Sequence, residues 1–409
     1  MRSRALLRAF GPGLAVALAL AACSGDDPSS TGPVGTVPRG SGPAPARSAT
    51  SPPLRVEVVA SGLEHGWDVG FLPDGRVLVT ERGAHLVLLS SGRAGATVTP
   101  VTADLADVQV RGEGGLMGLV VHPDFATTRR FTTCQTHQEN GDPVDIRLVT
   151  WRLAGDGRSA TRERDLLTGL PLAAGGRHSG CRTTLAADGT LLVGTGDTAD
   201  GRVAQDHGSL GGKVLRLDLV TGAPAAGNPF LGSANPKERY LWTYGHRNVQ
   251  GVAVRPGSGQ VLTAEHGPTF NDEINVLRPG ANYGWDPSRG GTVDGYDESV
   301  PMTDRERFPD AVDAVWQSGS TTQAVCAATF LTGRQWGALD GALVVTALKG
   351  AKLLVFTLDP QGAVTTVAVP PEFSQAYGRL RAARTAPDGA LYVTTSNGND
   401  DKLLRVTPA

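Results

Sequence analysis

The sequence lacks an excess of charge of either sign. Its 38 Lys and Arg residues nearly balance its 40 Asp and Glu residues, and the formal net charge is -2. A protein whose main partner is a nucleic acid usually carries a basic patch or stripe, and no such stripe offsets the acidic residues of this chain. The composition therefore argues against nucleic acid as the main partner.

The sequence also lacks a long apolar run beyond its first two dozen residues, and it lacks long stretches with a helical period of 3.6 residues. A membrane-spanning helix needs about 20 predominantly apolar residues, so we expect none in the body of the chain. Instead, 54 Gly and 27 Pro residues punctuate the sequence, and both favour turns. These features predict an all-β protein.

The N-terminal residues 1–22 have the pattern of a targeting segment. Three arginines precede an apolar core at 14–20, which is too short to span a bilayer as a helix. The core ends in Leu-Ala-Ala-Cys23, which resembles a bacterial lipobox, in which the Cys is acylated and becomes the first mature residue. A plain secretory signal cut near the same place is the alternative. There is no twin-Arg pair, so we expect export before folding and cofactor uptake outside.

Residues 23–53 are rich in Ser, Gly, Pro and Thr and contain almost no large apolar side chains. Such a segment cannot bury enough surface to offset its ordering entropy. We therefore expect a flexible linker between a lipid anchor at Cys23 and a domain that spans residues 54–409. The expected location is the outer face of the cell membrane.

Three cysteines remain if Cys23 is acylated, and the compartment is then oxidising. One disulfide with one leftover thiol is the simplest arrangement of Cys134, Cys181 and Cys326. Cys134 and Cys181 lie in consecutive strand regions and are the preferred pair, although the sequence leaves the other pairings open.

From residue 54 onward one pattern recurs six times. A turn, often Pro-Asp-Gly or Asp-Gly, is followed by an alternating apolar strand, a polar break and a second apolar strand. Asp-Gly favours tight turns because Gly tolerates a positive φ. Six copies at intervals of roughly 50–80 residues predict a six-bladed β-propeller. The paired strands are expected near 76–80 and 84–89, 130–136 and 146–153, 190–195 and 213–218, 260–263 and 273–277, 342–346 and 352–358, and 390–394 and 402–406.

Polar side chains in the loops between these strands are candidates for a site at the propeller axis. Four cations come from three blades, and such a cluster is unfavourable unless an anion with several oxygens occupies it. Solvated loop residues without a ligand are the simpler alternative. The four cations are Arg247, Lys349, Arg379 and Arg381.

Two further loops carry candidate chemistry. Backbone carbonyls at Gly267 and Pro268, with the carboxylates of Asp272 and Glu273, offer the hard oxygen ligands that suit Ca²⁺. His178 lies in a Gly-rich loop and could serve as a base near neutral pH. The alternatives are a solvated acidic loop and a structural histidine.

Several longer motifs, in the same order along the chain, resemble the glucose/sorbosone dehydrogenase family, whose members are soluble quinoproteins that use pyrroloquinoline quinone (PQQ). The resemblance covers nearly the whole of residues 62–409 and is closer to the aldose sugar dehydrogenase branch. Its most specific parts are Gly-His-Arg-Asn-Val-Gln-Gly at 245–251, Glu-His-Gly-Pro at 265–268, Asp-Glu-Ile-Asn at 272–275, Arg-Pro-Gly-Ala-Asn-Tyr-Gly-Trp at 278–285 and Gly-Arg-Leu-Arg at 378–381.

The resemblance implies roles for the candidate residues. His178 would remove the sugar hydroxyl proton while hydride passes to the quinone. Arg247 and Asn248 would contact the cofactor, with Arg247 near the reactive quinone oxygens. PQQ carries three carboxylates, and the residues implied to hold them are Lys349, Arg379 and Arg381.

The resemblance also implies two calcium ions. The carbonyls of Gly267 and Pro268 would hold the calcium that binds the quinone, where it would act as a Lewis acid. Glu273 and the backbone of Tyr283 would be ligands of a second, structural calcium.

Some positions depart from the family pattern. Glu113 stands where a Gln is usual, near the cofactor, and its charge could weaken binding of a trianionic ligand or alter metal binding. Gly66 replaces a usual Pro, and Arg177 precedes His178 where soluble glucose dehydrogenases have Asp. The segment 317–328, near the expected sugar pocket, matches poorly and contains Cys326.

The function expected from the sequence is oxidation of aldose sugars at C1 to lactones, dependent on PQQ and Ca²⁺, with an external electron acceptor of unknown identity. Two alternatives stay open: a non-catalytic binding propeller at the cell surface, and a calcium-dependent sugar-lactone hydrolase. Fold alone does not separate the three.

Overall fold

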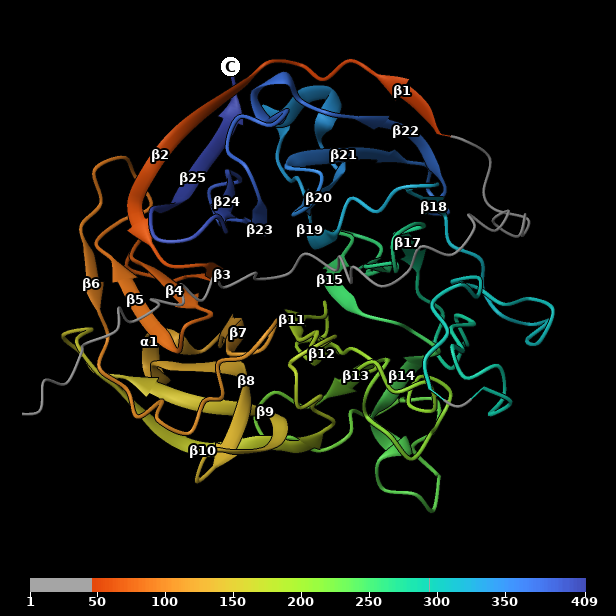
Figure 1. The fold of residues 1–409 in the computed structure, drawn as a ribbon. Coiled ribbons are helices and arrows are strands. Elements are labelled where there is room, and N and C mark those ends of the chain that lie inside the picture. The colour runs from red at the N-terminus through yellow and green to blue at the C-terminus, as the bar shows by residue number, and fades with distance from the viewer. Residues whose placement is uncertain (1–45, 294) are drawn as a thin grey trace, which may run out of the picture.

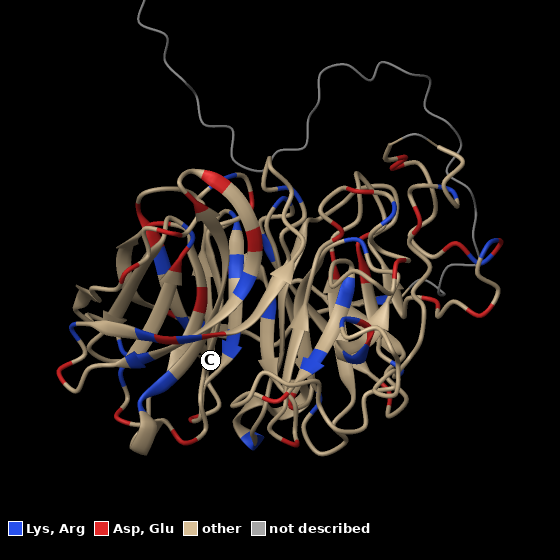
Figure 2. Cartoon of the chain, turned by 90° about the horizontal axis from the view of Figure 1, so that it is seen from below, with Lys and Arg blue, Asp and Glu red and all other residues tan. Residues whose placement is uncertain are grey.

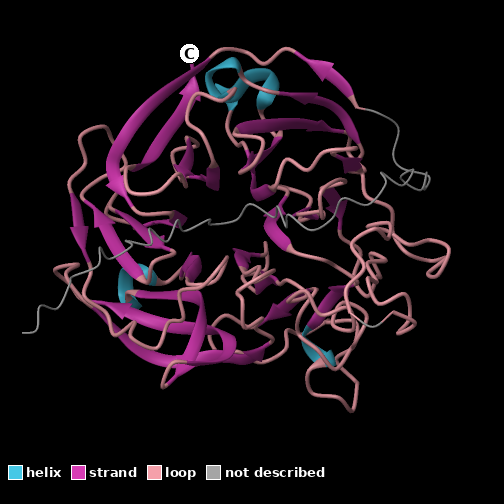
Figure 3. Ribbon diagram, viewed as in Figure 1, coloured by secondary structure: helices cyan, strands magenta, loops and turns pink. Residues whose placement is uncertain are grey.

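The computed structural model describes residues 46–293 and 295–409. Within these residues, six β-sheets surround a central axis, and their innermost strands ring the centre of the view in Figure 1. Helical segments are few and short, as Figure 3 shows. The predicted all-β, six-bladed propeller is therefore confirmed.

We number the blades by chain order. Blade 1 contains β3 (Gly66–Phe71), β4 (Val77–Glu81), β5 (His85–Leu89) and β6 (Val98–Pro100). Blade 2 contains β7 (Leu116–Val121), β8 (Arg130–Glu139), β9 (Asp142–Leu153) and β10 (Ala160–Leu170). Blade 3 contains β11 (Arg182–Leu185), β12 (Leu191–Gly194), β13 (Lys213–Leu217) and β14 (Leu241–Tyr244). Blade 4 contains β15 (Val249–Val254), β16 (Val261–Glu265), β17 (Glu273–Val276) and β18 (Trp316–Gln317).

Blade 5 contains β19 (Val325–Phe330), β20 (Leu343–Ala347), β21 (Lys352–Leu358) and β22 (Val364–Ala368). Blade 6 contains β23 (Leu380–Thr385), β24 (Leu391–Thr395), β25 (Asp401–Pro408) and β2 (Leu54–Leu63). The helical segments are α1 (Phe125–Thr128) and the 3-10 turns Glu238–Tyr240, Arg334–Leu339 and Pro371–Phe373.

The ring closes because blade 6 is built from both ends of the domain. Strand β2, the first strand of the domain, pairs antiparallel with β25, the last strand of the chain, with Leu54 opposite Pro408 and Val56 opposite Val406. The two ends of the domain thus complete one sheet, which holds the ring of blades closed.

The recurring Asp-Gly turns join the first and second strands of a blade. In blade 3, the Asp188 side chain accepts a hydrogen bond from the amide of Thr190 (3.1 Å), and Gly189 adopts φ +81°. Asp388 and Gly389 repeat this arrangement in blade 6, where the amide of Ala390 donates to Asp388 (3.1 Å). Gly meets the positive φ at no steric cost, which explains why this dipeptide marks the hairpins.

The hydrophobic core lies between adjacent blades. One cluster joins blades 2 and 3 and includes Met117, Ile146 and Leu215. Another joins blades 5 and 6 and includes Val344 and Leu404. Alternating side chains along each strand thus face the neighbouring sheet, which fixes the blades relative to one another.

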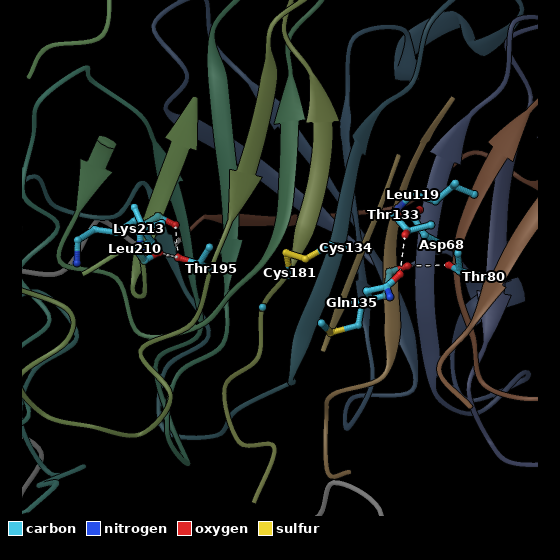
Figure 4. Close-up of a disulfide and its surroundings, with 12 residues drawn as sticks. Asp68, Thr80, Leu119, Thr133, Cys134, Gln135, Cys181, Thr195, Leu210 and Lys213 are labelled. Atoms are coloured by element: carbon cyan, nitrogen blue, oxygen red, sulfur yellow. Dashed lines mark hydrogen bonds between the residues drawn. A yellow bond between two sulfur atoms is a disulfide. The ribbon is translucent and has the colours of Figure 1, made fainter. Parts of the chain in front are cut away.

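The predicted Cys134–Cys181 disulfide is confirmed. It links β8 of blade 2 to the residue just before β11 of blade 3, as Figure 4 shows. Cys326 is a free, buried thiol.

Part of the segment predicted as a flexible linker forms a strand instead. Strand β1 (Arg47–Ala49) pairs in parallel with β22 at the outer edge of blade 5, with Arg47 opposite Thr366. The predicted signal peptide and Cys23 lie outside the described residues. None of the helices in the part that the structure describes has the length and apolarity to cross a membrane.

The blade topology brings distant loops to one end of the axis. The first and second strands of each blade are antiparallel, so the loop before the first strand and the loop after the second lie at the same end. The site is therefore built from these loops.

Figure 2 shows Lys and Arg residues interspersed with Asp and Glu residues over the described blades.

Candidate active site

A cavity of about 350 Å³ lies where the loops of blades 2 to 6 meet. Many of its lining residues precede first strands, among them Glu113 in blade 2, His178 in blade 3, Arg247 in blade 4 and Arg379 in blade 6. Others follow second strands, among them Pro268 after β16 and Lys349 after β20. The predicted convergence of these loops is therefore observed.

His178 is held by a buried carboxylate. Its Nδ1 lies 2.7 Å from Oδ1 of Asp197, which follows β12 and is fully buried. The indole of Trp285 (2.7 Å) and the hydroxyl of Tyr296 (2.5 Å) both donate to Oδ2 of Asp197. An ionised Asp197 requires a proton on Nδ1 of His178, which leaves Nε2 as the basic nitrogen.

The ionisation of Asp197 follows from its surroundings. Burial acts to raise its pKa, but the charge of His178 and its hydrogen bond, the charge of Arg247 and the hydroxyl of Tyr296 together lower the pKa below its usual value. The pair is thus arranged as a base and the group that orients it.

The loop that carries His178 is fixed at several points. The amide of His178 donates to Oε1 of Glu113 (3.2 Å), and the amide of Gly180 donates to the side-chain oxygen of Asn248 (3.2 Å). The disulfide at Cys181 follows directly. His178 itself adopts φ +49°, a region that non-glycine residues seldom occupy without such support.

Arg247 is buried and bound to oxygen atoms on two sides. Its Nη1 donates to the carbonyls of His266 (2.9 Å) and Gly267 (3.1 Å), and its Nη2 donates to Oε1 of Glu298 (2.6 Å). Its Nε is buried and has no hydrogen-bond partner within the described part of the chain. Arg247 therefore already binds one carboxylate and keeps a further donor.

Glu113 is half-buried and links three parts of the site. Besides the His178 amide, it accepts hydrogen bonds from the side chains of Asn248 (3.0 Å) and Gln250 (3.2 Å). Burial acts to raise its pKa, but the charge of His178, the hydrogen bond from Asn248 and the charge of His266 lower it. The cavity thus contains an ionised carboxylate where the family pattern has an amide.

The cations of blades 5 and 6 differ from one another in position. Lys349 is exposed and Arg379 half-buried, and both line the cavity. Arg381 is buried one step deeper in β23, where its Nη1 donates to Oε1 of Gln250 (3.2 Å) and approaches Sγ of Cys326 (3.5 Å). It does not line the cavity.

The residues predicted to bind calcium fall in two places. Pro268 lines the cavity, and the Gly267 carbonyl faces Arg247 and His266. The side chain of Asp272 is buried and accepts a hydrogen bond from the Gly267 amide (2.9 Å), so it shapes the loop.

Glu273 lies away from the cavity lining, next to a second buried carboxylate. Asn275 donates to both Glu265 (3.4 Å) and Glu273 (3.3 Å), while its own side-chain oxygen is buried without a partner among the described residues. Burial and the charge of Glu265 raise the pKa of Glu273 to about 8. Tyr283, also predicted as a ligand, stacks its ring on His246 at 4.6 Å. Among the described side chains, no group of three or more His, Cys, Asp or Glu residues is arranged to hold a metal ion.

Three residues of the site were missed from the sequence. Asp197 follows an Asp-Gly strand in Gly194-Thr-Gly-Asp197, and its position after a second strand was an available signal. Tyr296 and Glu298 lie in the long connection between β17 and β18, where no periodicity or motif marks them.

Comparison with known proteins identifies the family of this chain. A family model described as glucose/sorbosone dehydrogenase matches residues 63–405. The chain is 30% identical over 359 residues to an aldose sugar dehydrogenase of Escherichia coli (strain K12), covering 87% of this chain and 93% of that protein.

Solved structures agree as well. A PQQ-bound aldose sugar dehydrogenase from Streptomyces coelicolor is 29% identical, with a TM-score of 0.70 over 88% of this chain and 99% of that chain. A putative oxidoreductase (glucose dehydrogenase) from Thermus thermophilus is 34% identical, with a TM-score of 0.73 over 86% of this chain and 99% of that one. The family inferred from the motifs is therefore confirmed: the chain belongs to the glucose/sorbosone dehydrogenase family, a family of oxidoreductases.

Proposed function

We propose that this protein oxidises aldose sugars at C1 to lactones with PQQ as the electron acceptor in the site, Ca²⁺ as a second cofactor and His178 as the base. The observation that carries the proposal is the His178–Asp197 pair at the wall of a cavity that Arg247, Lys349 and Arg379 also line. The aldose sugar dehydrogenases among its relatives support the substrate class.

The cavity residues fit a ligand with several carboxylates. Arg247 holds the carboxylate of Glu298 and has a buried Nε without a partner among the described residues, and Lys349 and Arg379 add two more positive charges. Charge-assisted hydrogen bonds of this kind are among the strongest that proteins form. Arg247 and Asn248 would lie beside the quinone ring, and Lys349 and Arg379 would hold its carboxylates. Arg381, buried in β23 outside the cavity lining, would add a further positive charge near the site.

Calcium binding is proposed because several buried side-chain oxygen atoms lie close together. Glu265, Glu273 and the side-chain oxygen of Asn275 bring together buried oxygen atoms that suit a hard cation, and Tyr283 would add a backbone carbonyl. The carbonyls of Gly267 and Pro268 would hold the ion at the cavity, where Arg247 is now the partner of Gly267.

The chemistry then divides between cofactor and protein. PQQ, when bound, supplies the two-electron acceptor for the hydride that leaves C1. Nε2 of His178 takes the proton of the C1 hydroxyl as the C1=O bond forms. Asp197 keeps Nδ1 of His178 protonated and stabilises the positive charge that the ring then carries. Arg247, fixed by His266 and Gly267, orients the reacting groups.

The test is reconstitution of the soluble domain, from about residue 46 onward, with PQQ and CaCl₂. Sugar-dependent reduction of a redox dye across a panel of aldoses is the expected result. A folded, calcium-loaded protein that binds no PQQ would contradict the proposal.

We further propose export and acylation at Cys23, with the domain on the outer face of the cell membrane and electrons passed to an external acceptor. The motif at 20–23 supports this. Mass spectrometry of the mature N-terminus should find a lipid-modified Cys23, and an unmodified N-terminus would contradict the anchor.

A further inference from the structure

The cavity wall contains an ion pair whose Arg member has no role in the reaction proposed above. Arg177 and Glu298 both line the cavity, and Nη2 of Arg177 lies 2.9 Å from Oε1 of Glu298. Their side chains are 57% and 36% exposed, so both reach the cavity space as well as each other. Arg177 is the residue directly before the base His178, so the pair lies next to the reaction centre.

The geometry of Glu298 leaves one oxygen available. Both Arg177 and Arg247 (2.6 Å) donate to Oε1, while Oε2 accepts no hydrogen bond from any residue that the structure describes. The surrounding arginines lower the pKa of Glu298 against the effect of burial, so the carboxylate is charged. An ionised acceptor thus stands beside a guanidinium that retains further N–H donors.

The connection between β17 and β18 holds this pair in place. Tyr296, two residues before Glu298, donates to Asp197 and lies 5.8 Å from the His178 ring between centroids. The guanidinium of Arg177 lies over the same tyrosine ring at 6.0 Å. Tyr296 is therefore a positioning residue that ties the pair to the base.

We infer that Arg177 and Glu298 form a subsite that binds hydroxyl groups of the sugar and selects neutral sugars over acidic ones. A sugar hydroxyl both donates and accepts, so it can donate to Oε2 of Glu298 and accept from Arg177. The hydroxyl groups of a neutral sugar can therefore form hydrogen bonds with both Glu298 and Arg177. The carboxylate of an acidic sugar in this subsite would meet the like charge of Glu298, which is unfavourable. The inference rests on the proposed function for the assignment of a sugar as the substrate.

The variant Glu298→Gln separates this role from a structural one. It keeps the shape of the side chain but removes the charge that neutralises Arg177 and Arg247. We expect the KM for glucose to rise about tenfold or more, because a hydrogen bond to a charged group is lost. We expect PQQ binding to be as tight as in the wild type or tighter, because a negative charge leaves the cavity. Damage to the fold would weaken both.

Substrate preference provides the decisive readout. With Glu298 neutral, Arg177 is free to bind a carboxylate, so the ratio of kcat/KM for glucuronate to that for glucose should rise at least about tenfold in Glu298→Gln. Adding Arg177→Ala should abolish the gain. Glu139→Gln is the matched control, because Glu139 is 68% exposed and does not line the cavity. An unchanged ratio and KM in Glu298→Gln would overturn the subsite.

Sugar binding without turnover distinguishes the two proposals. Saturation-transfer NMR on the cofactor-free protein should show glucose bound more tightly than glucuronate, with the order reversed in Glu298→Gln. That result in a protein without dehydrogenase activity would support the subsite and contradict the proposed function. Turnover with an unaltered preference would support the function and overturn the subsite.

Discussion

The two walls of the cavity are built differently. On the wall from blades 3 and 4, His178, Arg247 and Asn248 are 4%, 3% and 1% exposed, and each is held by hydrogen bonds. On the wall from blades 5 and 6, Lys349 is exposed and forms no ion pair with any residue in the described ranges, and Arg379 is half-buried.

The two walls therefore supply different things: the buried wall supplies fixed geometry, and the exposed wall supplies positive charge. A buried, hydrogen-bonded wall keeps its side chains in one arrangement before any ligand arrives, which a proton transfer requires. An exposed Lys supplies charge and can adjust its long side chain to a bound anion. We therefore expect changes on the first wall to act mainly on turnover and changes on the second to act mainly on cofactor affinity.

The largest effect is expected from Asp197→Asn on the buried wall. The amide would no longer hold the proton on Nδ1 of His178, so the base would be lost or wrongly oriented. We expect kcat to fall between about 10²- and 10⁴-fold, the range for loss of general-base catalysis, while PQQ affinity changes little. The measurement is steady-state dye reduction beside a PQQ titration. A weaker PQQ affinity with an intact kcat would contradict the assignment.

A smaller effect, on affinity, is expected at the exposed wall. Lys349→Ala and Arg379→Ala each remove one charge-assisted contact of about 1.5–3 kcal/mol, which corresponds to a rise in the PQQ Kd of roughly 10- to 150-fold. Arg202→Ala is a suitable control because Arg202 is 83% exposed and pairs with Asp200 outside the cavity. A Kd equal to that of the control would remove the residue from the cofactor site.

A still smaller change in PQQ affinity, in the opposite direction, is expected for Glu113→Gln. The carboxylate of Glu113 opposes a trianionic ligand, so the amide should tighten PQQ binding by up to about tenfold. Because the pKa of Glu113 is lowered, the charge is present throughout the range from about pH 5 to 8, and the gain should stay constant over that range. PQQ titrations of both proteins at the two ends and the middle of this range test this. Weaker binding by the variant would mean that Glu113 supports the cofactor.

The smallest effect is expected at Glu273, and it concerns the stability of the fold. Its pKa is raised to about 8, so between about pH 4.5 and 8 the folded protein keeps a proton that the unfolded chain has lost. The free energy of unfolding should therefore fall as pH rises through this window, by at most about 1.4 kcal/mol per pH unit. Urea unfolding in EDTA should show this slope, and Glu273→Gln should reduce it. Equal slopes would contradict the account.

Much of the fold could be predicted because its signals are local. The Asp-Gly pairs at 188–189 and 388–389 specify turns through the Asp side chain and the positive φ of Gly. Once the blades are set, the loops that carry His178, Arg247 and Arg379 must meet at one end of the axis. The same order of strands favoured the disulfide between neighbouring blades, although it left the other pairings open.

The rest of the site depended on contacts that the sequence does not encode locally. Asp197 acts because the turn after β12 brings it to His178, and Glu298 reaches Arg247 from a connection with no regular structure. Arg379 and Arg381 were both expected among the cations of the site, but only Arg379, which precedes β23, lines the cavity. Arg381 lies buried within β23, toward Cys326. The β1–β22 pairing likewise arises from the tertiary position of residues 47–49.

The most direct test of the account compares His178→Ala with Lys349→Ala in parallel PQQ titrations and dye-reduction assays at saturating PQQ. We predict that His178→Ala lowers kcat by at least about 10²-fold with little change in PQQ Kd, and that Lys349→Ala changes the Kd by a larger factor than kcat. Loss of PQQ binding in His178→Ala, or the same balance of effects in both variants, would contradict the division of the cavity into a catalytic and a cofactor-binding wall.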